Sequence, residues 1–146
     1  MAVVGLIALG GCSNGPPVAV QPPDAHVAGC HRLHDALPDS VDERERRETT
    51  PPSARTAAWG DPAVVLRCGV PRPAGLTPTA EVVVVDGVAW FLAEQSSSRG
   101  SPPYVFTSTG HKTYVEVRVP GSVPRAEATA PLTDLAAAIK QAIGRS

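Results

Sequence analysis

Residues 113–119, with the sequence TYVEVRV, constrain the fold more than any other segment because they alternate strictly. Valine occupies positions 115, 117 and 119, and these valines alternate with Tyr114, Glu116 and Arg118. Successive side chains of a β-strand point to opposite faces, so the valines share one face and the other three residues share the opposite one. The segment therefore predicts a strand in a sheet with one buried and one wet face.

Four further segments have the β-branched or aromatic composition of short strands, and they cover residues 63–68, 81–86, 88–94 and 104–108. Asp86 and Gly87 separate two of them and predict a hairpin, because glycine tolerates a positive φ. A turn at residues 109–112 predicts a second hairpin between 104–108 and the alternating strand. Residues 95–103 are expected to form a polar loop.

Two segments have apolar residues at helical spacing. Residues 30–37 predict a short helix that ends before Pro38. Residues 131–144 predict an amphipathic helix, with Pro131 in its first turn and Gly144 at its C-terminal cap. The element order predicts an α+β fold with a mainly antiparallel sheet of about five strands. A short N-terminal helix is expected, and the C-terminal amphipathic helix packs on the sheet within a single domain of residues 28–146.

Residues 42–48, DERERRE, mix acidic and basic side chains. On a helix, Asp42 and Arg46 would pair at i, i+4 spacing, as would Glu43 and Arg47. Exposed pairs of this kind contribute only about 0.3–0.5 kcal/mol each. We interpret the segment as a solvated connector, with a docking patch as the alternative.

The N-terminus has the features of a signal for export and lipid attachment. Residues 2–11 form an uncharged apolar run, too short for a membrane-spanning helix but of the length of a signal-peptide core. The sequence LGGC at residues 9–12 resembles the bacterial lipobox, in which the thiol of the cysteine receives diacylglycerol. We therefore expect a signal peptide at 1–11 and a lipid on Cys12, followed by a Pro-rich tether at 12–27.

One feature of this N-terminus departs from a signal peptide. No Lys or Arg precedes Cys12, so Met1 is suspected to lie downstream of the true start. The alternative is a buried N-terminal strand with a free structural thiol at Cys12.

The chain has three cysteines. A lipid on Cys12 leaves Cys30 and Cys68, an even number in an oxidising compartment, and a bridge between them would contribute about 4 kcal/mol. Alternatively, Cys30 is a reactive or metal-bound thiol beside His31 and His34. Zinc sites need three or four ligands, and the sequence has no second Cys/His cluster, so we predict no metal and no cofactor.

Charge and motifs restrict the function further. The net charge is −1 without a basic cluster, which argues against nucleic-acid binding. The sequence contains no Gly-x-Ser-x-Gly elbow, phosphate loop, dinucleotide fingerprint or His-Glu-x-x-His motif. We therefore predict a monomeric, non-enzymatic module on the extracytoplasmic face of the membrane, with an envelope protein or the cell wall as partner. The alternative is an envelope enzyme that uses Cys30, His31 and His34.

The aromatic residues raise a second possibility for binding. Trp90 and Phe91 are adjacent and must face opposite sides of a strand. One of them, together with Tyr114, could stack on a sugar or a peptide if exposed. Ordinary packing under loops and helices is the competing interpretation.

The chain resembles a family of actinobacterial exported lipoproteins that share a domain of unknown function (DUF3515). The resemblance covers about residues 28–143, and its most specific part is the block AWGDPAVVLRCGVP at 58–71. Supporting matches are Cys30 with Leu37-Pro38, GVAWF at 87–91, YVFT at 104–107 and YVEV at 114–117. Departures are Ala63, where many members have proline, and the uncharged start. The resemblance implies an envelope lipoprotein with Cys30 and Cys68 as a pair, and it carries over no catalytic residue.

Overall fold

The computed structural model describes residues 15–24, 27–93 and 100–144. An eight-stranded sheet forms its centre, and every pair of neighbouring strands is antiparallel. In spatial order the strands are β2 (Ser40–Val41), β3 (Arg44–Arg47), β5 (Thr56–Trp59), β6 (Val64–Val70), β10 (Tyr114–Val119), β9 (Tyr104–Ser108), β8 (Val88–Ala93) and β7 (Val83–Val85). The α+β class and the antiparallel sheet are thus confirmed, but the expected number of about five strands was too low.

Both hairpins predicted from turn residues are present. Asp86 and Gly87 join β7 to β8 with φ values of 48° and 85°. These are the positive φ values that a two-residue hairpin turn requires. Strands β9 and β10 pair antiparallel, with Phe106 opposite Val117. The alternating strand buries Val115, Val117 and Val119 completely, as its pattern predicts. The opposite face is not wet throughout as expected, because Glu116 is also buried and forms ion pairs with two arginines.

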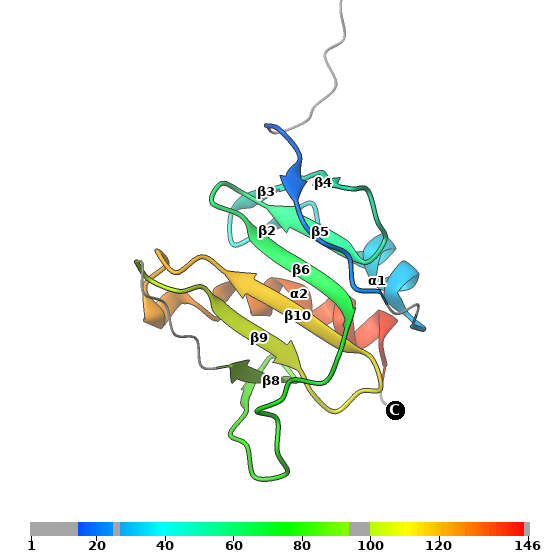
Figure 1. Ribbon diagram of the computed structural model, residues 1–146, viewed down its shortest axis with the longest axis vertical. Coiled ribbons are helices and arrows are strands. Elements are labelled where there is room, and N and C mark those ends of the chain that lie inside the picture. The colour runs from blue at the N-terminus through cyan, green and yellow to red at the C-terminus, as the bar shows by residue number, and fades with distance from the viewer. Residues whose placement is uncertain (1–14, 25–26, 94–99, 145–146) are drawn as a thin grey trace, which may run out of the picture.

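Two helices lie on one face of the sheet, α1 (Cys30–Ala36) and α2 (Ala130–Ala142), and Figure 1 shows both behind it. A short 3-10 helix, η1 (Arg125–Glu127), precedes α2. Helix α2 has a proline in its first turn and a fully buried apolar stripe of Leu132, Leu135, Ala136 and Ile139. The predicted helices are confirmed within about two residues at their ends.

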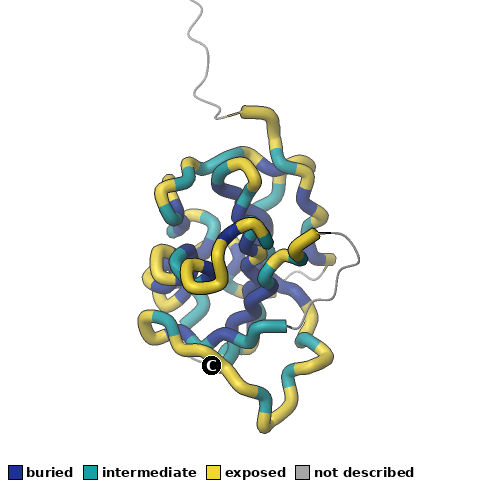
Figure 2. The backbone as a smooth tube through the Cα atoms, turned by 90° about the vertical axis from the view of Figure 1, so that its left-hand side faces the viewer, coloured by how far each residue is buried: buried dark blue, intermediate teal, exposed yellow. Residues whose placement is uncertain are grey.

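The main core lies between the helices and the sheet (Figure 2, dark blue). Its largest fully buried side chains are Trp59, Trp90 and Phe106. Burial of such aromatic side chains removes the most apolar area per residue from water. The domain is therefore held chiefly by the valine face of the sheet against α1 and α2.

The charged segment 42–48 is not the solvated connector that its composition predicts. Residues 44–47 form β3, whose Arg46 and Arg47 pair with Trp59 and Ala58 of β5. The guanidinium of Arg46 lies 5.8 Å from the centre of the Trp59 ring, on the helix side of the sheet. Pairing with a distant strand thus overrides the weak local preference for paired charges on a helix.

Residues 15–24, the described part of the segment that follows Cys12, are docked on the domain. Strand β1 (Val18–Ala19) pairs in parallel with β4 (Thr49–Thr50), and the N–H of Val18 donates to the Glu48 carbonyl at 2.8 Å. Three arginines also donate to backbone carbonyls of the segment: Arg47 to Pro16, Arg67 to Gln21 and Arg55 to Pro23. These hydrogen bonds hold residues 16–23 against the domain, so ordered structure begins well before residue 28. The prolines of the segment do not prevent this, because a proline carbonyl still accepts a hydrogen bond although proline has no N–H to donate.

Candidate functional site

Cys30 and Cys68 form a disulfide that joins the start of α1 to β6, with their Cα atoms 5.7 Å apart. Both residues are buried in the main core. In this state neither sulfur is a thiolate, so neither can act as a nucleophile or a metal ligand. Among the described residues, no group of three or more His, Cys, Asp or Glu side chains could hold a metal ion.

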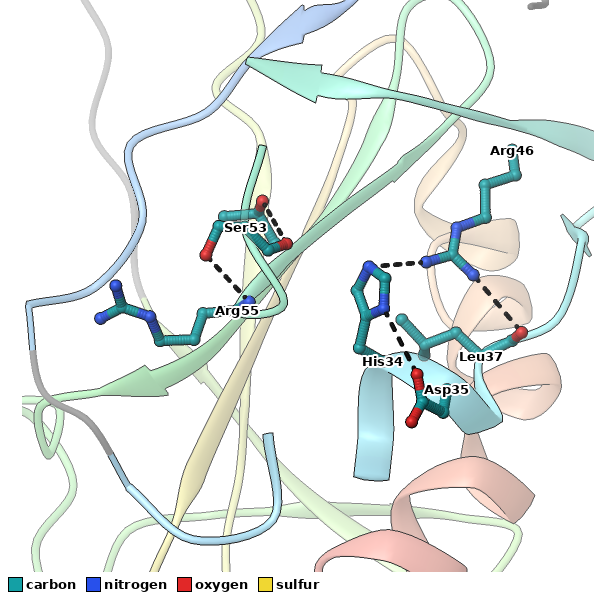
Figure 3. Close-up of polar contacts among 7 residues, drawn as sticks. His34, Asp35, Leu37, Arg46, Ser53 and Arg55 are labelled. Carbon is teal, nitrogen blue, oxygen red and sulfur yellow. Dashed lines mark hydrogen bonds and ion pairs between the residues drawn. The ribbon is translucent and has the colours of Figure 1, made fainter. Parts of the chain in front are cut away.

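The two histidines of α1 have different surroundings. His31 is exposed, whereas Nε2 of His34 lies 3.2 Å from Nη2 of Arg46 (Figure 3). Since a guanidinium only donates, His34 must accept this hydrogen bond through an unprotonated Nε2. Nδ1 of the same ring lies 4.0 Å from the Asp35 carboxylate. Arg46 also donates to the Leu37 carbonyl at 3.5 Å, so the contacts of His34 fix the end of α1 to β3.

The pKa of His34 is lowered from its ordinary value of 6.5. Burial is the largest cause, because it disfavours the charged ring, and the positive charge of Arg46 follows; Asp35 acts in the opposite direction. Below about pH 6.5 the unfolded chain therefore binds a proton that the folded chain binds less readily. Stability gained through His34 is present above this pH and is lost as the pH falls through the lowered pKa.

We expect His34→Gln to reduce the loss of stability on acidification, because glutamine can still accept from Arg46 but does not titrate. Urea midpoints measured at about pH 7.5 and about pH 5 check this. The exposed His31→Gln variant is the matched control and should keep most of the wild-type loss, because His31 is the smallest of the causes that lower the pKa of His34. Equal losses in wild type and His34→Gln would contradict the assignment.

The aromatic residues proposed to stack on a ligand make contacts within the domain and do not form an exposed stacking surface. Trp90 is fully buried on the helix side. Phe91 is half-buried on the opposite face, where Gly75 lies so close that an added Cβ would meet the ring at 3.1 Å. The Tyr114 hydroxyl accepts a hydrogen bond from Arg72 at 3.0 Å. Ordinary packing therefore accounts for Phe91 and Tyr114, and for the burial of the Trp90 ring.

A cavity of about 770 Å³ lies where β7, β8 and β9 meet the chain that leads into η1. Its surface is about half polar and half apolar, and the apolar part comes from residues that include Val82, Val83, Trp90, Leu92 and Tyr104. Two charged residues, Glu81 and Arg125, also line it. Cavities of this size with a few polar groups are typical of binding sites.

Two features mark this region as the candidate site. The buried indole Nε1 of Trp90 has no hydrogen-bond partner among the residues that the structure describes, and a buried unpaired donor calls for an explanation. In addition, Val82, Val83 and Val84 are 45%, 40% and 65% exposed. Apolar side chains gathered beside a cavity are typical of an interaction surface.

Sequence reasoning predicted a strand at 81–86 but not its exposure. A run of valines indicates a strand and does not tell whether a helix covers it. The flanking Glu81 and Asp86 were the available signal, since charged residues often protect an edge strand.

Comparisons with known proteins identify a family but no characterised relative. The family model described as "Protein of unknown function (DUF3515)" matches residues 1–146. No curated protein and no solved structure matches the chain. Within the described part of the chain, no helix is long and apolar enough to cross a membrane.

Proposed function

The chain belongs to the DUF3515 family of proteins of unknown function, and on that premise we propose that it is an extracytoplasmic lipoprotein anchored through a lipid on Cys12. Its domain acts as a non-enzymatic binding module at the cell envelope. The observation that carries this proposal is the distribution of the cysteines. Two of the three form the Cys30–Cys68 disulfide, and the remaining one stands at the end of the sequence LGGC.

The disulfide supports export. Disulfides persist in secreted and envelope proteins and are rare in the reducing cytosol. Cys12 is thereby left without a bridging partner within the chain, in the sequence context where a lipobox cysteine receives diacylglycerol. Two or three acyl chains on this residue suffice for stable attachment, because each buried CH₂ contributes about 0.8 kcal/mol.

The docked N-terminal segment determines how such an anchor would hold the domain. Arg47 binds the carbonyl of Pro16, only four residues after Cys12. Four residues of extended chain reach at most about 14 Å. A lipid on Cys12 would therefore keep the β1 end of the domain next to the membrane. The loop of residues 71–82, which leads into β7, lies at the opposite end of the long axis (Figure 1).

This arrangement favours a binding role over an enzymatic one. The cavity and the exposed valines lie away from the proposed membrane side, where a partner could reach them. The thiol on which the enzymatic alternative depends is engaged in the disulfide. Among the described residues, no group of three or more His, Cys, Asp or Glu side chains could hold a catalytic metal ion in its place.

We expect Cys12→Ser to move the protein from the membrane fraction to the soluble fraction, or to leave it as an unprocessed precursor. The reason is that serine lacks the sulfur that receives the lipid. Fractionation of cells, followed by salt and detergent extraction of the membranes, measures this. Ser13→Ala, at the next residue, is the matched control and should stay in the membrane and require detergent. A Cys12→Ser protein that is processed to the mature length and still remains in the membrane at the wild-type level would refute the anchor.

A further inference from the structure

Strand β7 is the last strand of the eight-stranded sheet, and in the described structure it pairs only with β8. Alternate residues of such an edge strand direct their N–H and C=O groups away from the sheet. These groups form a template for a further strand. Charged residues flank this edge, yet Val82 and two residues of the strand itself, Val83 and Val84, are exposed.

The two ends of this edge carry the same sign of charge. Glu81 stands before the valines and Asp86 after them, and both are exposed. Within the described residues, neither carboxylate has an ion-pair partner within 4 Å. Two cations are in the region, but Lys140 donates to the backbone carbonyl of Asp86, and Arg125 contributes to the lining of the cavity.

This charge pattern disfavours pairing between two copies of the chain. In an antiparallel pair of edges centred on the valines, Glu81 of each copy faces Asp86 of the other. In a parallel pair in register, each carboxylate lies beside its own counterpart. Like charges directly opposite each other destabilise a strand pair. The edge therefore offers apolar and backbone contacts while it repels a second copy of itself.

We propose that β7 binds an extended segment of a different protein by strand addition, and that this segment has apolar residues between two basic ends. Backbone hydrogen bonds supply affinity in this mode, and side-chain pockets supply specificity. Val82 and Val83 line the 770 Å³ cavity, so apolar side chains on one face of the added strand would enter it. Basic residues at the ends of the strand would lie beside Glu81 and Asp86.

This inference names the partner class of the binding module proposed above and rests on that half of the proposal. It does not depend on the lipid at Cys12. Loss of peptide binding and loss of membrane attachment are measured separately, so the two claims can fail independently.

The test uses the full chain in detergent micelles and a fluorescent, end-capped peptide of sequence Lys-Val-Thr-Val-Thr-Lys, followed by fluorescence anisotropy. The control peptide has Glu at both ends. We expect the basic-ended peptide to bind the wild type about tenfold more tightly, because both of its ends attract where both ends of the control repel. In the double variant Glu81→Lys/Asp86→Lys the preference should reverse. Both positions are exposed. Because Asp86 has a positive φ in the turn, far-UV circular dichroism must first show that the double variant keeps the fold, and Glu81→Lys/Asp86→Asn, which keeps a residue suited to this turn, should lose the preference for basic ends even though it does not reverse it.

A single substitution provides an independent readout. The Glu81→Lys variant alone changes how two copies of the chain would pair. In an antiparallel pair of edges, the introduced lysine of each copy lies opposite Asp86 of the other copy, so two attractive contacts replace two repulsive ones. This variant should therefore self-associate in sedimentation experiments, whereas the wild type and the double variant should stay monomeric. The inference is overturned if neither peptide binds, if both bind equally, or if the wild type itself pairs through this edge.

Discussion

The Cys30→Ala/Cys68→Ala variant unfolds at a urea concentration about 2 M below that of the wild type, from a loss of about 4 kcal/mol in the free energy of unfolding. The bridge spans a sequence separation of 38 residues and so removes much of the conformational freedom of the unfolded chain. It also ties α1 to β6, so its loss affects the layer of helices as well as the sheet. Alanine avoids burial of new hydroxyl groups at two core positions.

Reduction of the wild type under native conditions is the chemical control. It should shift the urea midpoint in the same direction without any change of sequence. His31→Gln, at an exposed position next to Cys30, should leave the midpoint nearly unchanged. Coincident midpoints for the wild type and the double alanine variant would show that the bridge contributes nothing.

Trp59→Ala should be the most damaging single substitution on the sheet, at about 3–5 kcal/mol of unfolding free energy. Trp59 is fully buried, its Nε1 donates to the Pro38 carbonyl at 3.0 Å, and Arg46 lies over its ring. Truncation opens a cavity between β5 and the helices and also removes a hydrogen bond. Urea or thermal unfolding followed by far-UV circular dichroism measures the loss.

Two milder substitutions separate the contribution of the Trp59 hydrogen bond to stability from the contribution of the buried ring volume. Trp59→Phe leaves the Pro38 carbonyl without its donor, whereas Trp90→Phe removes an Nε1 that has no partner in the described structure. Both replace a fully buried indole with a smaller ring. We expect Trp59→Phe to cost about 1–3 kcal/mol more than Trp90→Phe. Equal costs would mean that the Trp59 hydrogen bond is without net effect.

The elements that the sequence predicted correctly are those with strong local signals. Asp86-Gly87 specifies a hairpin turn through backbone conformations that few other residue pairs adopt. The apolar stripe of α2 and the strict alternation of β10 extend over enough residues to distinguish a period of 3.6 from a period of two. The cysteine count indicated the Cys30–Cys68 bridge, because an even number remains once Cys12 is set apart.

The elements that were missed depend on contacts between distant parts of the chain. Strand β3 has a composition typical of exposed surface, and only its pairing with β5 and the contact between Arg46 and Trp59 make it part of the sheet. Strand β1 has two residues, and hydrogen bonds to β4 and to three distant arginines hold its segment in place. No local pattern encodes such partners.

The candidate site also combines features that local sequence predicts with features that depend on distant contacts. The strand at 81–86 was predictable from its valines, but its position at the edge of the sheet depends on the order of all eight strands. The unpaired Nε1 of Trp90 depends on which acceptors the fold brings near it. The sequence therefore indicated which residues form a strand there, and the fold alone determined that three of the valines are exposed.

The lipid proposed on Cys12 is the feature that would hold this domain at the membrane. Mass spectrometry of the N-terminal peptide, from protein purified out of the membrane fraction, detects this lipid without any change of sequence. We expect the mature chain to begin at Cys12 and this residue to carry the added mass of a thioether-linked diacylglycerol. A peptide that continues from Leu9 through an unmodified Cys12 would contradict it.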